Sequence, residues 1–231
     1  DFYNAYRYQL PQVKDEVVLS KIVMFPKLTD AHKQEIIDKL KKIKQDILNG
    51  ESFESKARIY SDDPGSAANG GLYTNIRKSQ MVKIFEATAL NLQEGEISDP
   101  VESEFGFHII QLVKKSGKLY DARHILLKAE PNAEEIAAAR QELENIKQDI
   151  ISGKVTFKDA AFKHSDDKNT KFNAGVVPGK DGSDRTEKLS LSADVAYQIA
   201  GLNKNDLTDI FSEEVNQKKA LVLMKVNEVI P

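Results

Sequence analysis

The segment IKQDI at residues 43–47 recurs letter for letter at residues 146–150, an offset of 146 − 43 = 103. The match extends further along the chain: Ser-Asp-Asp at 61–63 recurs at 165–167, and Gly71 recurs as Gly175, one residue later in register. A period of this length is far longer than a solenoid repeat and equals the size of an independent domain. We therefore predict a duplicated domain.

The repeat also predicts where the domains begin and end. The first copy is expected to span residues 16–115 and the second residues 119–230, joined by the short polar stretch 114–118. A linker this short does not let two domains tumble freely. Residues 1–15 belong to neither copy, and their several aromatic residues followed by Pro11 suggest the tail of an upstream helical domain.

The elements follow one another in the same predicted order in each copy. In the first copy, residues 17–25 are rich in β-branched and apolar residues and are expected to form a strand. Helices are expected at 29–48, 52–60 and 79–90, each with a cap or a helical stripe of apolar residues. Residues 107–113 alternate as a closing strand. This order predicts the α+β class, with a small antiparallel sheet flanked by helices.

Composition excludes several classes of function. Hydrophobic residues make up 40% and charged residues 30%, the profile of a globular protein, and a net charge of -3 offers no field for nucleic acid. The absence of Cys excludes disulfides and Cys-ligated zinc, and no metal or cofactor is expected. No apolar run is long enough to insert in a membrane. Because the chain opens at Asp1, we expect a processed protein or a fragment whose targeting segment lies elsewhere.

Short motifs recur in a fixed order through the first copy. They are Tyr60-Ser61-Asp62-Asp63, Asn69-Gly70-Gly71-Leu72, Gln80-Met81-Val82, Phe85-Glu86, Gly95-Glu96-Ile97-Ser98 and Phe105-Gly106-Phe107-His108-Ile109-Ile110. The second copy contributes Ala122-Arg123-His124-Ile125-Leu126-Leu127. The ordered set resembles the parvulin family of peptidyl-prolyl cis-trans isomerases. The resemblance implies two parvulin (FKBP-like) domains, each with a four-stranded antiparallel sheet flanked by helices and a shallow proline pocket.

Two parvulin copies behind a helical segment also look like the SurA-type chaperones, with most of an N-terminal domain missing. This resemblance implies a periplasmic isomerase and chaperone that uses no cofactor. Its partners would be unfolded or extended proline-containing polypeptides, outer-membrane proteins in particular.

The family pattern also implies site residues. Parvulins carry two histidines and an Asp or Cys on the pocket floor, beside a Leu, a Met and a Phe that hold the proline ring. The first copy matches with the catalytic candidates Asp63 and His108 and the substrate-binding candidates Leu72, Met81, Phe85 and Phe105. It departs at Lys21, where the first histidine is expected, so the usual hydrogen-bond network is not expected in this copy.

The second copy shows the opposite loss. It keeps the catalytic candidates His124 and Asp167, but Leu191 and Val195 stand where Met and Phe are expected. The Gly-Phe-His of the closing strand is aligned with Lys-Lys-Ala at 218–220. Since neither copy is complete, we expect weak catalysis, carried mainly by the first copy.

Each candidate also has a structural interpretation. His108 and His124 equally fit buried, hydrogen-bonded core residues. Met81 and Phe85, one helical turn apart, fit a core stripe, and the Asp pairs before the loops fit loop capping. Lone histidines on helix surfaces, His32 and His164, receive no function.

Three functions therefore remain open. The first is an active prolyl isomerase. The second is a non-catalytic module that holds extended client peptides. The third is a pair of spacers that only fix the geometry of an upstream domain, with pockets filled by their own side chains.

Overall fold

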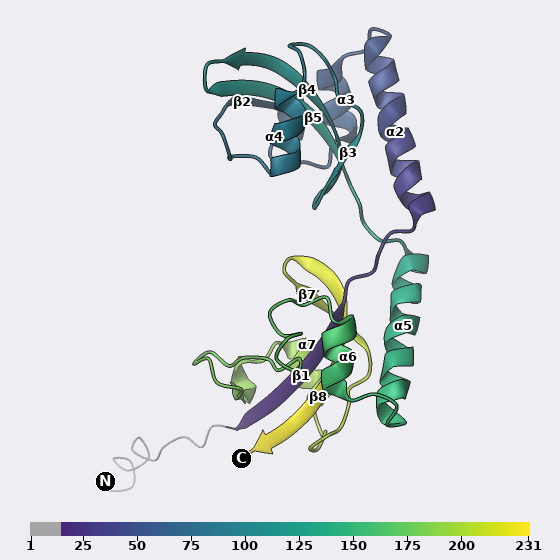
Figure 1. The fold of residues 1–231 in the computed structure, drawn as a ribbon, viewed down its shortest axis with the longest axis vertical. Coiled ribbons are helices and arrows are strands. Elements are labelled where there is room, and N and C mark those ends of the chain that lie inside the picture. Colours follow the sequence, from purple (N-terminus) through teal and green to yellow (C-terminus); the bar gives the residue numbers. More distant parts are fainter. Residues whose placement is uncertain (1–14) are drawn as a thin grey trace, which may run out of the picture. The chain divides into compact units, whose positions relative to one another are not determined.

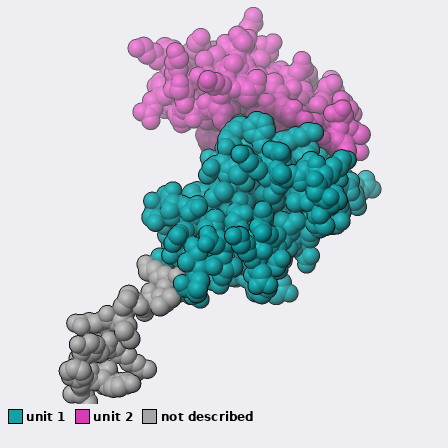
Figure 2. Space-filling view, turned by 60° about the horizontal axis from the view of Figure 1, so that its bottom comes forward, with its two compact units in different colours: residues 1–27, 133–231 teal, residues 28–132 magenta. Residues whose placement is uncertain are grey.

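The computed structural model describes residues 15–231 and divides the chain into two compact units, coloured separately in Figure 2. Unit 2 comprises residues 28–132, and unit 1 comprises the residues up to Lys27 together with 133–231. The predicted tail 1–15 lies, except for Asp15, outside the described residues. Among residues 15–231, no helix is long and apolar enough to cross a bilayer.

Unit 2 is built on a four-stranded antiparallel sheet (Figure 1). Its strands, in spatial order, are β2 (Leu72–Ile76), β5 (Leu119–Lys128), β4 (Gly106–Ser116) and β3 (Val101–Ser103). Its helices are α2 (Asp30–Leu48), α3 (Phe53–Tyr60), the short η1 (Ala67–Asn69) and α4 (Lys83–Leu90). The predicted α+β class is confirmed. Thr29 caps α2 as predicted, by accepting a hydrogen bond from the backbone of His32.

Unit 1 has the same architecture. Its strands, in spatial order, are β6 (Thr186–Glu187), β1 (Glu16–Met24), β8 (Lys218–Ile230) and β7 (Phe211–Val215). Its helices are α5 (Ala133–Ile151), α6 (Phe157–His164), the short η2 (Lys188–Ser190) and α7 (Ala193–Ile199). Figure 1 shows the first strand of the chain, in purple, beside the last, in yellow.

The first strands of the two repeats are exchanged. β5, which begins the second repeat, pairs with β4 of the first repeat, whereas β1 pairs with β8 of the second. Unit 2 is therefore inserted between β1 and α5 of unit 1, and it carries its first strand at its own C-terminal end. The compact units thus differ from the predicted domains 16–115 and 119–230.

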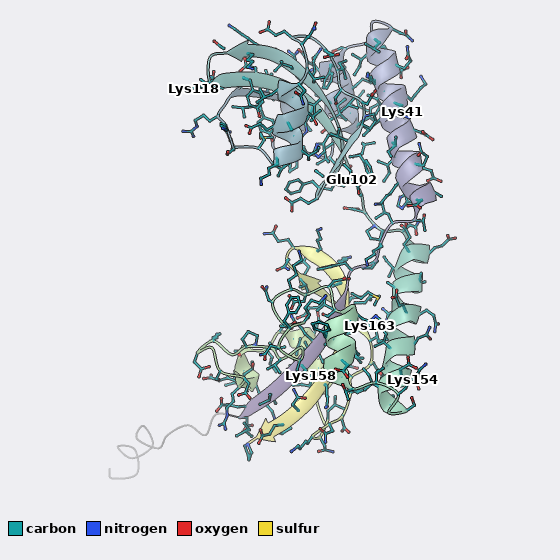
Figure 3. The ribbon with its side chains drawn as sticks, in the orientation of Figure 1. Lys41, Glu102, Lys118, Lys154, Lys158 and Lys163 are labelled. Atoms are coloured by element: carbon teal, nitrogen blue, oxygen red, sulfur yellow. The ribbon has the colours of Figure 1, made fainter. Side chains whose placement is uncertain are left out.

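A tight turn accounts for this difference. Ser116 pairs with Leu119, so only Gly117 and Lys118 separate β4 from β5, and Gly117 has a φ of +62°. Two-residue hairpin turns favour glycine at such positions. Figure 3 shows Lys118 at the tip of this hairpin. The stretch 114–118, predicted as an interdomain linker, is the end of β4 and its turn.

The exchanged strands have the same register against their partners. His124 lies opposite Ile110, and Lys21 lies opposite Met224. Each ladder also has one irregularity at the equivalent place, next to the pair Leu112–Ala122 in unit 2 and next to the pair Val226–Leu19 in unit 1. This register makes Lys21 the structural counterpart of His124.

Register also corrects the alignment of the closing strands. The β3–β4 hairpin ends at the pair Ser103–Gly106, whereas the β7–β8 hairpin continues to the pair Val215–Lys218. Measured by strand register, β8 is therefore paired for two residues more than β4 before its turn. The counterpart of the Gly-Phe-His at 106–108 is therefore Ala-Leu-Val at 220–222, not Lys-Lys-Ala at 218–220. Val222 stands where His108 stands in unit 2.

Alternation along the strands decides which residues meet. In β4, Phe107 and Ile109 pack on one face with α2 and α3, whereas Ile110 and Leu112 pack on the other with α4. Because successive side chains in a strand point to opposite faces, His108 lies on the α4 face. The same rule, applied to Ala122 in β5, places His124 on that face too.

Candidate active site

Two histidines lie side by side at the centre of the unit 2 sheet. His108 on β4 and His124 on β5 are 4% and 3% exposed. Their rings stack with centroids 5.4 Å apart at 17°, and their Nδ1 atoms are 3.2 Å apart. The predicted catalytic candidates of different repeats are brought together by the strand exchange.

Asp63 lies at one end of this pair, in the loop after α3. Its Oδ2 accepts hydrogen bonds from Nε2 of His124 at 2.8 Å, from the Ser66 hydroxyl at 2.6 Å and from the Tyr73 hydroxyl at 2.8 Å. The backbone N–H of Gly65 donates to Oδ1. These donors, His124 foremost, hold the pKa of Asp63 well below its usual range even though partial burial opposes them.

The hydrogen bonds allow one consistent assignment of protons. The Asp63 carboxylate can only accept, so Nε2 of a neutral His124 donates to it, and Nδ1 of the same ring then accepts from Nδ1 of His108. In a neutral His108 ring, Nε2 therefore accepts from the Ser103 hydroxyl, which lies 2.6 Å away. Both rings are neutral in this assignment. Burial, and next the neighbouring His124, lower the pKa of His108 to about 4, in agreement with a neutral ring.

Gly71 holds the Asp63 loop against β5. The backbone N–H of His124 donates to the carbonyl of Gly71 at 2.9 Å, and Gly71 has a φ of +81°. A Cβ at this position would lie 2.3 Å from the carbonyl oxygen of His124. Only glycine combines this backbone conformation with so close an approach.

The predicted substrate-binding residues lie at different depths. Phe85 on α4 is 1% exposed and meets both histidine rings edge-on, at 5.3 Å from His124 and 6.3 Å from His108. It therefore forms core beneath the pair. Leu72 and Met81 are half-buried, and Phe105, in the turn between β3 and β4, is 54% exposed. These three side chains remain accessible to a ligand.

The helix that was predicted over 79–90 begins only at Lys83. Ser79 has a φ of +68° and Val82 is extended, so Met81 lies in the segment before the helix. Met81 and Phe85 are therefore not successive residues of one helical stripe. The core interpretation therefore describes Phe85, which is buried, whereas Met81 lies at the edge of this core.

Unit 1 has no histidine pair at the equivalent place. Lys21 replaces His124, with its Nζ 3.6 Å from Oδ2 of Asp167, and Val222 replaces His108. Asp167 accepts a hydrogen bond from Thr170 at 2.8 Å, much as Asp63 accepts one from Ser66. Asp167, a predicted catalytic residue, thus lies in a different unit from the other three.

The neighbouring acids show a structural role. Asp62 accepts a hydrogen bond from the backbone of Lys128, and Asp166 accepts one from the backbone of Phe25. Asp62 thereby fastens the loop after α3 to the end of β5, and Asp166 fastens the loop after α6 to the end of β1. Loop capping therefore describes Asp62 and Asp166, whereas Asp63 also contacts the histidine pair.

Sequence reasoning missed three hydroxyl groups of the site. Ser66 follows Asp63 at the spacing of a local side-chain turn, a signal that could have identified it. Tyr73 and Ser103 carry no such signal, because their contacts to Asp63 and His108 depend on strand register. Residues 15–231 contain no group of three or more His, Asp or Glu side chains arranged to hold a metal ion.

Fold and site together define a parvulin-type protein: a four-stranded antiparallel sheet with helices on both faces and a buried histidine pair joined to an acid. Comparison with known families agrees. The model of the rotamase family, the PPIC-type PPIase domain, matches residues 21–114 and 124–228. The chain belongs to this family of peptidyl-prolyl isomerases.

Individual relatives carry foldase and chaperone names. Foldase protein PrsA 4 of Bacillus cereus is 32% identical over 150 residues, which cover 64% of this chain and 46% of the relative. Chaperone SurA of Chromohalobacter salexigens is 51% identical over 70 residues, covering 30% of this chain and 16% of the relative. A crystal structure of PrsA from Bacillus cereus covers 75% of this chain and 62% of its own, with 29% identity and a TM-score of 0.34.

These matches cover less than half the length of the curated relatives. The two family matches are each continuous in sequence: the first begins within β1 and the second within β5, the first strands of the two repeats. The compact units of the fold instead cross the boundary between the repeats.

Proposed function

We propose that the chain catalyses cis-trans isomerisation of X-Pro peptide bonds and that unit 2 carries the activity. The observation that supports this most is the hydrogen-bonded assembly of His108, His124 and Asp63 beside the accessible Leu72 and Met81. The first two positions of this assembly are occupied by Val222 and Lys21 in unit 1.

The reaction makes and breaks no covalent bond. The barrier to amide rotation is about 18–20 kcal/mol, and an X-Pro bond left alone isomerises over roughly tens to hundreds of seconds. Lowering the barrier by about 5 kcal/mol gives between three and four decades of rate. The reaction therefore needs no nucleophile and no metal, only an environment that favours the twisted amide over the planar one.

The site residues can supply that environment. A planar amide carries partial negative charge on oxygen and partial positive charge on nitrogen, and twisting removes both. In the proposed complex, Leu72, Met81 and Phe105 receive the proline ring and exclude water. The ionised Asp63, held by His124, faces the substrate carbonyl and disfavours its charge-separated planar form. The neutral histidine chain orients Asp63 without adding charge.

The test is a protease-coupled isomerisation assay on an Ala-Pro peptide. We expect His124→Gln to lower kcat/KM by at least about tenfold, because it breaks the chain between Ser103 and Asp63. Lys21→Gln, the equivalent change in unit 1, is the matched control and is expected to leave the rate unchanged. Equal losses in both variants, or a wild-type rate no higher than the uncatalysed one, would contradict the proposal.

A second function, favoured by a different observation, is non-catalytic binding of extended polypeptide by unit 1. Phe162 and Phe172 are 61% and 71% exposed, and their rings meet edge-on with centroids 5.9 Å apart. Such an exposed aromatic pair offers apolar surface to an unfolded chain. We expect Phe162→Ser with Phe172→Ser to shorten the time for which the protein keeps an unfolded client soluble. Ile59→Ser, at a 70% exposed position of unit 2, is the control.

We further propose that the clients are outer-membrane proteins and that the chain acts in the periplasm. The resemblance to SurA-type chaperones and the similarity to a chaperone named SurA support this. In light scattering, the chain should slow the aggregation of an unfolded outer-membrane β-barrel more than that of an unfolded water-soluble protein of similar size. Equal protection of the two would contradict the client preference.

A further inference from the structure

Equivalent groups fix β5 to unit 2 and β1 to unit 1, although these strands come first in their sequence repeats. In unit 2, Asp62 N donates to the carbonyl of Leu126 and the N–H of Leu126 donates to Ser61. In unit 1, Asp166 N donates to the carbonyl of Val23, whose N–H donates to Ser165. The contact from the N–H of His124 to Gly71 likewise has its counterpart from Lys21 to Gly175, at 2.8 Å. These contacts cannot distinguish one first strand from the other.

We propose that the chain has two alternative strand pairings and that the choice between them determines whether the isomerase site is complete. In the pairing described above, β5 lies beside β4. In the alternative, β1 lies beside β4 and β5 lies beside β8, in the same register. Lys21 would then stand next to His108, and His124 next to Val222, so neither unit would contain the histidine pair. This inference rests on the proposed function for its activity but not for its structural part.

A partly open, mainly apolar cavity in unit 1 bears on how well each of the two strands fits there. It measures about 250 Å³, and Val17, Val226, Ile199 and Leu202 are among the residues that line it. By strand register Val17 corresponds to Tyr120, and Val226 to Leu112. The helices α4 and α7, which begin after Val82 and Ser192, align Ile199 and Leu202 with Ala89 and Leu92.

Tyr120 packs in unit 2 among the residues that correspond to the walls of this cavity. Unit 1 therefore keeps an apolar space at the place where unit 2 holds a tyrosine ring. The alternative pairing would seat Tyr120 in this space and leave the smaller Val17 in unit 2. The unfilled volume would move from one unit to the other, so packing at this position favours neither pairing strongly.

The hydroxyl group of Tyr120 is a second, independent reason to expect that the two strand pairings compete. In unit 2 the Tyr120 hydroxyl is buried and has no hydrogen-bond partner among the described residues. A buried hydroxyl without a partner is destabilising. The unit 1 cavity is lined in part by Lys188, a side chain that can serve as a partner there. The gain of a hydrogen-bond partner for this hydroxyl favours the alternative pairing, whereas the two-residue turn between β4 and β5 favours the observed one.

Paired cysteine substitutions can measure both states, because the chain contains no Cys. Gln111 lies opposite Arg123 on β5, and the counterpart of Arg123 on β1 is Ser20. Residues directly opposite in antiparallel strands are close enough for a disulfide. Gln111→Cys with Arg123→Cys reports the observed pairing, and Gln111→Cys with Ser20→Cys reports the alternative. Residues 111 and 16 lie opposite each other in neither pairing, so Gln111→Cys with Glu16→Cys is the control.

Each protein is refolded from denaturant at low concentration, oxidised, and the intramolecular disulfide is measured by mass spectrometry. We expect nearly complete crosslinking of 111 with 123, and crosslinking of 111 with 20 in roughly 0.1–10% of molecules, the range of a minor state. A 111–20 yield no higher than that of the 16–111 control would overturn the proposal.

Two further measurements connect pairing with function and with the cause. The purified 111–20 crosslinked form should have less than about a tenth of the isomerase activity of the 111–123 form; equal activities would overturn the link. Tyr120→Phe, which removes the unpartnered hydroxyl, should lower the 111–20 yield several-fold, whereas Tyr197→Phe at an 80% exposed position should not. If the wild type proves inactive, the proposed function fails, but the disulfide yields still decide the pairing.

Discussion

Unit 1 and unit 2 share one backbone plan and differ in the side chains at its centre. In unit 2, His108 and His124 stack and connect Ser103 to Asp63. In unit 1, a valine and a lysine occupy the two histidine positions, yet the loop with its acid lies against the first strand in the same way. The plan is held by backbone hydrogen bonds and apolar packing, so it survives without the histidines. The site is therefore separable from the fold.

The largest effect is expected when the chain is cut either along its compact units or along its sequence repeats. A fragment of residues 28–132 contains both cores of unit 2 and the complete histidine pair. We expect it to unfold cooperatively and to keep its isomerase activity within about threefold, as an independent domain does. A fragment of residues 16–115, the sequence repeat, lacks His124 and should be inactive. Circular dichroism and the peptide assay check both; an active 16–115 fragment would show that His124 is dispensable.

Equivalent glycines allow the units to be broken one at a time. Gly71→Ala would place a methyl group 2.3 Å from the carbonyl oxygen of His124, and Gly175→Ala would place one 2.5 Å from that of Lys21. Both glycines also have positive φ, so we expect each change to cost roughly 3–4 kcal/mol. Only Gly71→Ala should abolish activity. Denaturant unfolding and the peptide assay on both variants distinguish the two units.

The histidine pair should make the stability of unit 2 depend on pH. The pKa of His108 falls from 6.5 to about 4 on folding, so between these values the unfolded chain binds a proton that the folded chain does not. Stability is therefore lost as pH falls from about 6.5 to about 4, by about 3 kcal/mol. Folding also lowers the pKa of Asp63 from its ordinary value of 3.8, so the stability from that acid is lost mainly below pH 4 and adds little within this window.

His108→Val, which copies Val222 of unit 1, should flatten this dependence. Urea unfolding of the wild type and the variant at pH 4.5 and 7 provides the measurement, because the first pH lies near the lower end of the window and the second lies above it. A variant as sensitive to pH as the wild type would assign the effect to another group.

The smallest effect is expected at Tyr73. Its hydroxyl donates to Asp63 at 2.8 Å, and Tyr73→Phe removes this single hydrogen bond. We expect a loss of about 1 kcal/mol in stability. The pKa of Asp63 should rise, because one of its donors is gone, and activity should begin to fall at a higher pH on the acid side. A pH profile with an unchanged acid limb would mean that Ser66 and His124 suffice to hold Asp63.

Local structure followed from the sequence where one segment contained the whole signal. The repeat, the helix over Asp30–Leu48 with its Thr29 cap, and the strand over Glu16–Met24 are examples. The helix expected from Ser79 was too long at its start, because the apolar pattern does not reveal that Ser79 adopts a positive φ.

The partners of the strands could not be predicted in the same way. β1 and β5 have the same pattern and the same register, so the sequence does not state which of them lies beside β4. For this reason Asp63, His108 and His124 were identified one by one, but each copy looked incomplete. Val222 was missed because the β7–β8 hairpin is longer than its counterpart.

The position of β5 behind β4 also has a consequence in time. On a ribosome the chain emerges from its N-terminus, so β1 is available when β4 appears, and β5 follows only after the turn at Gly117. Synthesis at about 5–20 residues per second separates the end of β4 from the end of β5 by roughly a second. During that interval β1 is the only first strand that β4 can meet. A nascent chain thus encounters the inactive partner before the active one.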